Sequence, residues 1–339
     1  MGKTYRFATT QCSFGWPIKP QYNPYDEHFR AESVSENVEN SVALQLKLFE
    51  EAGRQGADLV LGAEDMQRLG HYGMYLRDPG IFRSRVETIP GPTSRRIARV
   101  ARKYRMYIVA CYPEKAGRLY YNTAVLFGRT GRILGKYRKV QLPAGENWVY
   151  RPGRSFPVFR TELGNIGIAI CYDIMFPEIV RCLALNGADL ICHPTMGYGW
   201  TEEIGEATVK SRCVDNGVHI IVSCGKRSQV VDPWGRALCD AGTRKNVVVS
   251  ADVDLAAGQV QPPNHYGSVL SGIRDLRERW TKERQSAGFG VLSARRPPLM
   301  KRYSPKFPPS RPEEIRKVFE AYEQEQIRIA RGLAAKYTW

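Results

Sequence analysis

Long apolar runs are missing from this sequence of 339 residues, and their absence excludes several classes of protein. No run approaches the roughly 18 apolar residues of a membrane-spanning helix. The first residues, Met1 to Arg6, lead into a strand-like run and not into the apolar segment and cleavage site of a signal peptide. Myristoylation is also disfavoured, since its pattern requires Ser or Thr at position 6. We therefore expect a cytoplasmic protein that does not bind membranes.

Cysteine and histidine are sparse, and neither is arranged as a framework. Eight cysteines are too dilute for a disulfide scaffold, and no two form a CxxC pair. The five histidines lack HxxxH or HxH spacing, which leaves a zinc site without support. Most cysteines are therefore expected to fill the core in a reducing compartment. The sequence predicts neither a bound metal nor another cofactor.

Acidic residues are few beside basic ones, and this imbalance raises the question of nucleic acid. The chain has 50 Lys and Arg against 34 Asp and Glu, a net charge of +16. Half of the excess lies in residues 257–339, with 16 basic and 8 acidic residues interleaved with eight prolines. Clustered cations bind phosphate backbones, but no finger, helix-turn-helix or aromatic RNA-binding signature accompanies them. We interpret the charge as a solvated basic surface and do not expect a nucleic-acid partner.

Short apolar runs alternate with helical patterns over the first 250 residues, which is typical of an α/β fold. Two packed sheets with helices outside would bury every apolar face. The predicted strands are Tyr5–Cys12, Asp58–Ala63, Met106–Cys111, Tyr121–Phe127, Ile133–Tyr137, Phe156–Thr161, Ile166–Cys171 (joined to the preceding strand through Gly164-Asn165), Ala188–Cys192, Val218–Cys224 and Val247–Val253. The predicted helices are Ser35–Gly53, Thr93–Tyr104 with Thr93 as N-cap, Pro177–Asn186, Glu202–Asp215 and Pro312–Lys336.

The composition changes after residue 255, from this alternation to Pro, Gly and basic residues with one terminal helix. Such a segment cannot build a core of its own. We therefore expect residues 1–255 to form the catalytic domain. We expect residues 256–339 to be an extension that wraps this domain or a neighbouring subunit.

Three side chains capable of chemistry follow predicted strands. Cys171 stands between an apolar strand and a helix that begins with Pro177, and Glu64 ends another strand. Lys139 follows a third strand, with Glu146 seven residues later. Each alone has a structural alternative: a buried cysteine, a capping or solvent-facing carboxylate, or one more lysine of a basic chain. A thiol, a carboxylate and an ammonium, each at the edge of a sheet, together favour a catalytic centre.

The segments around these residues resemble the signature blocks of the nitrilase, or carbon-nitrogen hydrolase, superfamily. The matching blocks are Gly62-Ala63-Glu64, Tyr137-Arg138-Lys139-Val140-Gln141-Leu142 with Glu146 and Pro152-Gly153, and Gly167 to Glu178 around Cys171, with later blocks at Leu185–Ile191, Ser211–Gly217 and Val231–Gly235. The resemblance covers roughly residues 5–255. It implies an α/β fold, a four-layer αββα sandwich that forms homodimers or higher homo-oligomers through its outer helices.

The resemblance also implies a role for each residue. Cys171 is the nucleophile that forms an acyl-thioester, and Lys139 favours its thiolate and stabilises the oxyanion together with the backbone N–H of Tyr172. Glu64 takes the thiol proton, gives it to the leaving amine and later activates water. Glu146 positions the lysine and the substrate.

The resemblance implies that the substrate is a small amide or an N-carbamoyl amine, because Tyr-Asp after the nucleophile is similar to the amidase and carbamoyl-hydrolase branches. The candidate pocket residues are Tyr72, Trp148, Thr195, Met196 and Trp200, and each aromatic residue has core packing as its alternative. Nitrile hydrolysis and acyl transfer to an amine use the same residues and remain alternatives. So does a catalytically silent fold retained for interactions or for binding nucleic acid.

Overall fold

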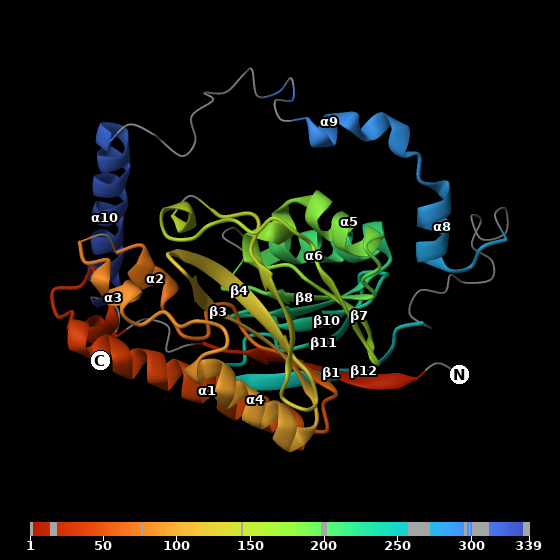
Figure 1. Cartoon of the computed structure of the whole chain (residues 1–339), viewed down its shortest axis with the longest axis horizontal. Helices are drawn as coiled ribbons and strands as arrows, with labels where there is room; N and C mark the ends of the chain where they lie inside the picture. The colour runs from red at the N-terminus through yellow and green to blue at the C-terminus, as the bar shows by residue number, and fades with distance from the viewer. Residues whose placement is uncertain are drawn as a thin grey trace.

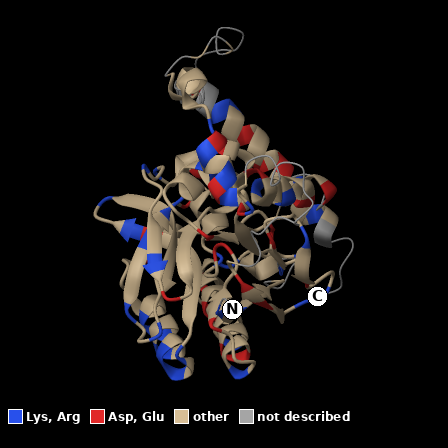
Figure 2. Ribbon diagram, turned by 90° about the vertical axis from the view of Figure 1, so that its right-hand side faces the viewer, with Lys and Arg blue, Asp and Glu red and all other residues tan. Residues whose placement is uncertain are grey.

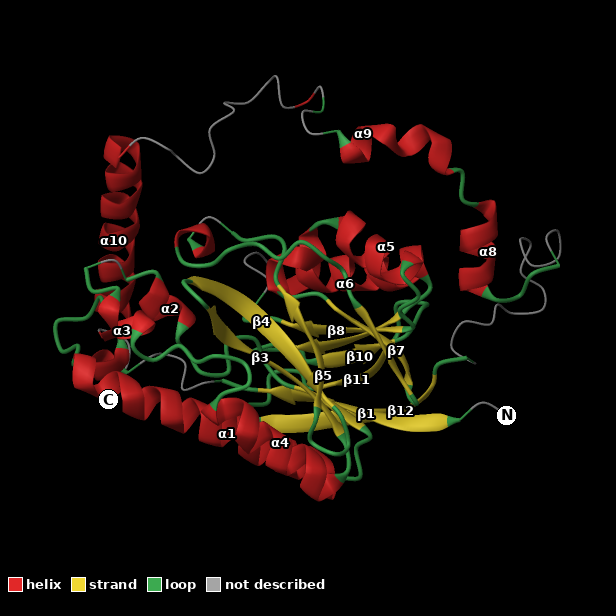
Figure 3. Cartoon of the chain, in the orientation of Figure 1, coloured by secondary structure: helices red, strands yellow, loops and turns green. Residues whose placement is uncertain are grey.

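Two six-stranded sheets pack face to face, with helices on their outer faces (Figures 1 and 3). This arrangement is seen in a computed structural model that describes residues 3–13, 19–75, 77–143, 145–197, 202–256, 272–294, 297, 299 and 312–334. It confirms the predicted four-layer sandwich.

The first sheet has the strand order β12-β1-β2-β3-β4-β5. Its central strands β1, β2 and β3 are parallel, and the outer pairs are antiparallel. The bounds are β1 Thr4–Gln11, β2 Leu59–Leu61, β3 Tyr107–Ala116, β4 Leu119–Phe127, β5 Ile133–Arg138 and β12 Val247–Asp254.

The second sheet repeats this plan in the order β11-β10-β9-β8-β7-β6, with β7, β8 and β9 parallel. Its bounds are β6 Val158–Thr161, β7 Gly164–Ile168, β8 Leu190–Pro194, β9 His219–Ser223, β10 Gln229–Val231 and β11 Ala237–Asp240. Each sheet therefore offers the carboxyl ends of parallel strands, the edge at which α/β folds place their sites.

Helices cover the outer face of each sheet. The helices α1 (Val34–Arg54) and α4 (Pro92–Tyr104) pack on the first sheet, and α5 (Pro177–Leu185) and α6 (Glu202–Asn216) pack on the second. The short helices are α2 Gly70–Gly73 and α3 Gly80–Arg83, with 3-10 turns η1 Pro20–Tyr22, η2 Ala31–Ser33, η3 Glu146–Trp148 and η4 Cys171–Met175.

The core has three layers, because successive strand residues point to opposite faces. In β1, Phe7 points between the sheets, where it meets residues such as Leu126 and Ile168, whereas Ala8 points toward the helices. Strands buried on both faces explain the nearly continuous apolar runs of the sequence.

Three local predictions differ from the structure. The first is that β7 ends at Ile168 and Cys171 begins η4, because the positive φ of Cys171 (45°) takes the chain out of the strand. The second difference is at the start of α4, which begins at Pro92. Thr93 was predicted to be the N-cap but lies inside the helix, where its N–H donates to the Glu87 carboxylate (2.8 Å).

The third difference is in the β6–β7 hairpin, where the predicted turn at Gly164-Asn165 lies earlier. Thr161 pairs with Gly164, so both predicted turn residues belong to β7.

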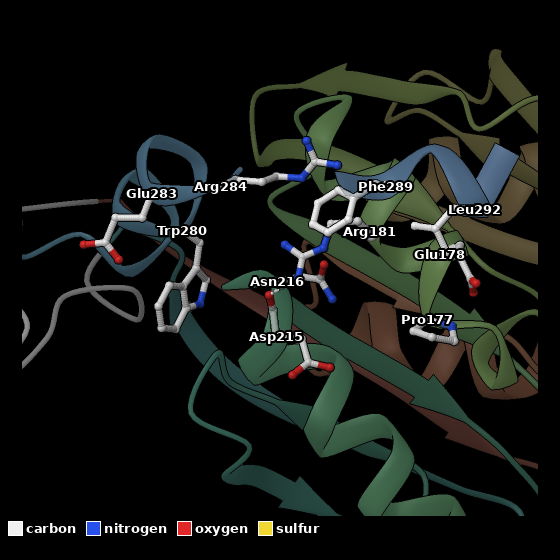
Figure 4. Close-up of a pocket in the computed structure, with 10 residues that line it drawn as sticks. All are labelled: Pro177, Glu178, Arg181, Asp215, Asn216, Trp280, Glu283, Arg284, Phe289 and Leu292. Carbon is white, nitrogen blue, oxygen red and sulfur yellow. Dashed lines mark hydrogen bonds between the residues drawn. The ribbon is translucent and has the colours of Figure 1, made fainter. Parts of the chain in front are cut away.

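The helices after residue 255 lie at two ends of the molecule (Figure 1). The helices α8 (Leu276–Glu283) and α9 (Gly290–Ser293), with η6 (Ser286–Phe289) between them, were not predicted. They form a cavity of about 600 Å³ with α5 and the end of α6 (Figure 4). At the other end, α10 (Pro312–Ala334) contacts the loops around α2 and η3. Among the helices in the described ranges, none has the length and apolar character needed to cross a membrane.

Candidate active site

Glu64 follows β2, at the carboxyl edge of the parallel part of the first sheet, and is 2% exposed. Its Oε1 accepts hydrogen bonds from Lys139 Nζ (3.1 Å) and Asn122 Nδ2 (2.9 Å). Its Oε2 accepts one from the backbone N–H of Met196 (2.9 Å). Burial opposes ionisation of this carboxyl, but the charge of Lys139 and the hydrogen bonds, including one from the Cys171 thiol, lower its pKa below the usual value. Glu64 is therefore a carboxylate at rest and can accept a proton.

Lys139 follows β5 and is completely buried. Besides Glu64, its Nζ donates to Glu146 Oε1 (2.7 Å). Burial disfavours its charge, but the negative charges of Glu64, Cys171 and Glu146 outweigh burial and raise its pKa well above the usual value. Because a buried charge is tolerated only when it is paired, the two carboxylates hold an ammonium inside the protein.

Glu146 lies in η3 and completes the pair of carboxylates around the ammonium. Its Oε2 is buried and, among the described residues, has no hydrogen-bond partner. Burial raises the pKa of Glu146 to about 7, although the charge of Lys139 opposes this. The free oxygen gives Glu146 an unused acceptor beside Lys139.

Cys171 lies at a sharp corner where the chain leaves β7 and enters η4. The corner is held by Asp173, whose carboxylate accepts hydrogen bonds from the N–H of Ile170 (2.9 Å), from the hydroxyl of Tyr137 (2.7 Å) and from the N–H of Gln141 (2.8 Å). One buried carboxylate therefore fastens the corner to the segment that carries Lys139. The loop after β8 lies beside the thiol, with Gly197 O at 3.9 Å from Sγ.

The charge of Lys139 favours the Cys171 thiolate, as the sequence led us to expect, but it is outweighed. Burial and the negative charge of Glu64 raise the pKa of the Cys171 thiol to about 12, and Lys139 and Thr195 oppose this only in part. Lys139 therefore does not produce a resting thiolate. The cysteine rests as a thiol next to an ionised carboxylate.

Tyr172 follows Cys171 at the start of η4, and its role as an oxyanion donor stays a prediction. Tyr172 is the second residue of η4, and the first hydrogen bond of this turn runs from the N–H of Asp173 to the Ile170 carbonyl. The N–H of Tyr172 therefore lies ahead of the intrahelical ladder. Such N–H groups at the start of a helical turn favour negative charge.

The structure places some of the predicted pocket residues at the site and others away from it. Thr195 and Met196 follow β8 at the site: the hydroxyl of Thr195 is near the thiol, and the N–H of Met196 holds Glu64. Trp148 is in η3 but packs against Phe319 of α10, with ring centroids 4.1 Å apart. Trp200 lies outside the described residues.

Tyr72 is a core residue whose hydroxyl already makes two hydrogen bonds within the protein. Its side chain is fully buried. Its hydroxyl donates to Tyr22 O (2.7 Å) and accepts from Asn37 Nδ2 (3.0 Å). We therefore correct its assignment to the pocket, since burial and these hydrogen bonds account for it as packing.

Two residues of the site were missed by sequence reasoning. Asn122 donates to Glu64, and its backbone carbonyl accepts from the N–H of Lys139 (2.9 Å). A polar residue in the apolar run of β4 was the available signal. Arg68 is 7% exposed, and its Nη1 lies 3.7 Å from the sulfur of Met196, but no sequence signal distinguished it from other arginines.

In the part of the chain that the structure describes, no three His, Cys, Asp or Glu side chains are placed to share a metal ion. The groups that act on Cys171 are two carboxylates, one ammonium and the Thr195 hydroxyl. Such a set can deprotonate a thiol and stabilise an oxyanion.

Comparisons with known proteins show the family of this chain. Residues 21–262 match the sequence profile of the family described as carbon-nitrogen hydrolase. The chain is 34% identical over 236 residues to the omega-amidase NIT2 of Bos taurus, covering 61% of this chain and 80% of that protein. It is 32% identical over 250 residues to the human omega-amidase NIT2, covering 66% and 86%. An amidase from Nesterenkonia sp. has a similar structure, with a TM-score of 0.59, 23% identity and coverage of 80% of this chain and 97% of that one. The chain belongs to the carbon-nitrogen hydrolase family of the nitrilase superfamily.

Proposed function

We propose that the protein is a thiol-dependent amidohydrolase that converts a small linear amide to a carboxylic acid and ammonia or an amine. One observation carries this proposal: the buried ammonium of Lys139 contacts both Glu64 (3.1 Å) and Glu146 (2.7 Å) beside a thiol at a sharp corner. A buried ammonium is costly to a protein that only needs a stable fold, so its presence favours catalysis.

Acylation begins with proton transfer from Cys171 to Glu64. As the Sγ–carbonyl bond forms, the carbonyl oxygen takes up the negative charge and is stabilised by Lys139 and by the N–H of Tyr172. Glu64 then gives its proton to the departing nitrogen, the carbon–nitrogen bond breaks and a thioester remains on Cys171.

Deacylation uses the same groups in the same order. Glu64 takes a proton from water, the hydroxyl attacks the thioester carbon, and Lys139 again stabilises the oxyanion. Collapse of the intermediate breaks the carbon–sulfur bond, the thiolate recovers the proton from Glu64, and the carboxylic acid leaves. Glu146 keeps Lys139 in place through both halves of the cycle.

The buried Arg68 narrows the proposed substrate class. Its guanidinium faces the buried Asp65 carboxyl and lies against Met196, whose N–H holds Glu64, so a cation is placed beside the segment that contacts Glu64. A cation there favours an amide that carries a carboxylate at its far end, because guanidinium and carboxylate match in shape and charge. The relatives whose printed names are omega-amidase NIT2 support the same choice. We therefore propose the terminal amide of a dicarboxylic acid.

The test is ammonia release from a terminal amide of a dicarboxylic acid, from a neutral aliphatic amide of the same chain length, and from N-carbamoyl amines and nitriles. We expect hydrolysis of the acidic amide to vanish in Cys171→Ala and to persist in Cys182→Ala, which removes a cysteine of α5. Arg68→Met should lower kcat/KM for the acidic amide by about 100-fold and change the neutral amide far less.

Each contrary result has a defined meaning. Activity that survives in Cys171→Ala would exclude this nucleophile. Hydrolysis of nitriles or N-carbamoyl amines alone would replace the amide with those substrates. Equal loss on both amides in Arg68→Met would remove the proposed carboxylate contact.

A further inference from the structure

Strand β5 presents two different faces to the molecule. Tyr137 is buried between the sheets, and Lys139, just beyond the strand, is buried in the candidate active site. Because strand residues alternate, Lys136 and Arg138 point to the opposite face, where Arg138 lies beside Thr123 of β4. The active site does not use this second face.

Residues 151–155 run along β5 and close a groove on this second face. The N–H of Arg151 donates to Tyr120 O (2.8 Å), and the N–H of Gly153 donates to Lys139 O (2.8 Å). Gly153 has to be glycine here, since a Cβ would lie 2.1 Å from the carbonyl oxygen of Arg138. The groove has a volume of about 800 Å³ and is lined by Leu119, Tyr121, Lys136, Arg138, Arg151, Pro152, Gly153, Arg154 and Ser155. This volume is within the usual range of small-molecule sites.

The groove has four cations and no acidic lining residue. Lys136 and Arg138 share one buried carboxylate beneath the groove, that of Glu114. Burial opposes ionisation of Glu114, but the hydrogen bonds from Arg138 and Lys136 lower its pKa below the usual value, so it is ionised. The single negative charge of Glu114 therefore compensates only one of the two positive charges of Lys136 and Arg138.

Arg151 and Arg154 supply the excess of positive charge. Both are exposed, and neither side chain makes an ion pair or a hydrogen bond within the described ranges. With Glu114 counted, the groove therefore carries about three uncompensated positive charges.

The positive surface continues beyond the groove. A neighbouring cavity of about 560 Å³ between α4 and β5 shares Lys136 with it and adds Arg95 and Arg132, again without an acidic lining residue. Separate guanidinium groups along one continuous surface match a ligand that has several anionic groups in a row. A single carboxylate would satisfy only one of them.

We propose that this groove binds a small anion with two or more linked phosphate groups. The guanidinium groups of Arg151 and Arg154 bind phosphate oxygens through their planar pairs of N–H donors. Arg138 is held for the same role by Glu114 and by the ring of Tyr121, which lies 3.8 Å from its guanidinium carbon. This site is separate from the amide site and does not depend on the proposed function.

The experiment is isothermal titration calorimetry of the full chain with inorganic pyrophosphate at constant ionic strength. We expect saturable binding to one site and a loss of at least about tenfold in affinity in Arg151→Ser/Arg154→Ser. The control is Arg316→Ser/Lys317→Ser, which removes the same net charge from the exposed surface of α10 and should bind as the parent does. Citrate, an organic anion of similar charge, should bind at least about tenfold more weakly.

Three results would overturn the proposal: no saturable binding, an equal loss in the control variant, or citrate binding as tightly as pyrophosphate. Thermal melting and amide hydrolysis check that each variant is folded. Both serine substitutions keep the backbone N–H bonds of residues 151 and 153. If the double variant fails to fold, Arg154→Ser alone replaces it, with an affinity loss of about threefold or more expected.

Discussion

The protonation state of Glu146 should affect both the activity and the stability of the protein. Its pKa is raised by burial to about 7, and only its ionised form makes an ion pair with Lys139. We expect kcat/KM to fall about tenfold for each pH unit below this pKa, and Glu146→Gln to lose that limb of the profile together with roughly 100-fold in kcat. A pH–rate series on both proteins measures this. An acid limb that persists unchanged in the variant would contradict it.

Stability should respond to pH with the opposite sign. The folded state binds the Glu146 proton more tightly than the unfolded chain does, since the ordinary pKa is 4.5. This group therefore contributes stability that is present at low pH and is lost as pH rises from 4.5 to about 7. The difference in melting temperature between the parent and Glu146→Gln should change across this window. The exposed Glu178→Gln serves as the control.

The thiol of Cys171 should become more reactive when its base is removed. The negative charge of Glu64 helps burial to raise the pKa of this thiol. In Glu64→Gln we expect alkylation of Cys171 by iodoacetamide to begin at lower pH than in the parent, although turnover falls by 100-fold or more. Mass spectrometry of the alkylated peptide measures the first effect. If the alkylation profile is unchanged or moves to higher pH, Glu64 does not control the thiol.

The site could be predicted from sequence only where a residue type carries the chemistry by itself. Cys171, Glu64 and Lys139 each follow a strand, and the structure brings them together. Asn122 stands out as a polar residue in an apolar run, but its role and that of Arg68 could not be predicted, since both depend on contacts across the fold. The hydrogen bond from the N–H of Met196 to Glu64, 132 residues away, is such a contact, and any residue type except proline could supply it.

The helix α10 holds the loop that carries Glu146. Trp148 of η3 packs against Phe319 (4.1 Å between centroids) and Tyr322 (5.9 Å). Such aromatic pairs contribute roughly 0.5–1.5 kcal/mol each. In Phe319→Ala/Tyr322→Ala we expect a several-fold lower kcat, and an acid limb of the pH–rate profile that moves below pH 7 because Glu146 gains solvent.

The control for this contact between α10 and η3 is Val318→Ala, which shortens a 39% exposed side chain on the same helix. Circular dichroism at the assay temperature should show both variants folded. A double variant whose pH–rate profile coincides with that of the parent would show that α10 does not position Glu146.

Whole elements were predictable where apolar periodicity is strong. The helix α1 and the strand β12 lie within one or two residues of their predicted bounds. The helices α8 and α9 were not predicted, because α8 has a mixed-charge sequence with little apolar periodicity and α9 is a single exposed turn of four residues. The corner at Cys171 was predicted between a strand and a helix, but its positive φ was not, since that conformation is held by Asp173.

At the scale of the whole molecule, Lys and Arg are spread over several surface elements (Figure 2). Repulsion between these positive charges opposes self-association, but it does not indicate which face of the molecule would form an interface. Apolar exposure is more specific. Leu185 at the end of α5 is 47% exposed, and Ile204 and Val214 of α6 are 53% and 38% exposed. Exposed apolar side chains that gather on neighbouring elements mark a contact surface. They lie on the outer helices, where the family resemblance places the dimer.

We therefore expect a homodimer that buries the outer surface of α5 and α6. A carboxylate at the centre of that contact would be desolvated without a partner, so Ile204→Asp should weaken dimerisation by at least about tenfold. The matched control is Leu134→Asp, which places the same charge on β5 at a side chain that is 46% exposed. Sedimentation equilibrium over a range of concentrations measures both. A parent protein that stays monomeric, or a control that dissociates as readily as Ile204→Asp, would contradict an interface on these helices, because the added charge and not its position would then decide the outcome.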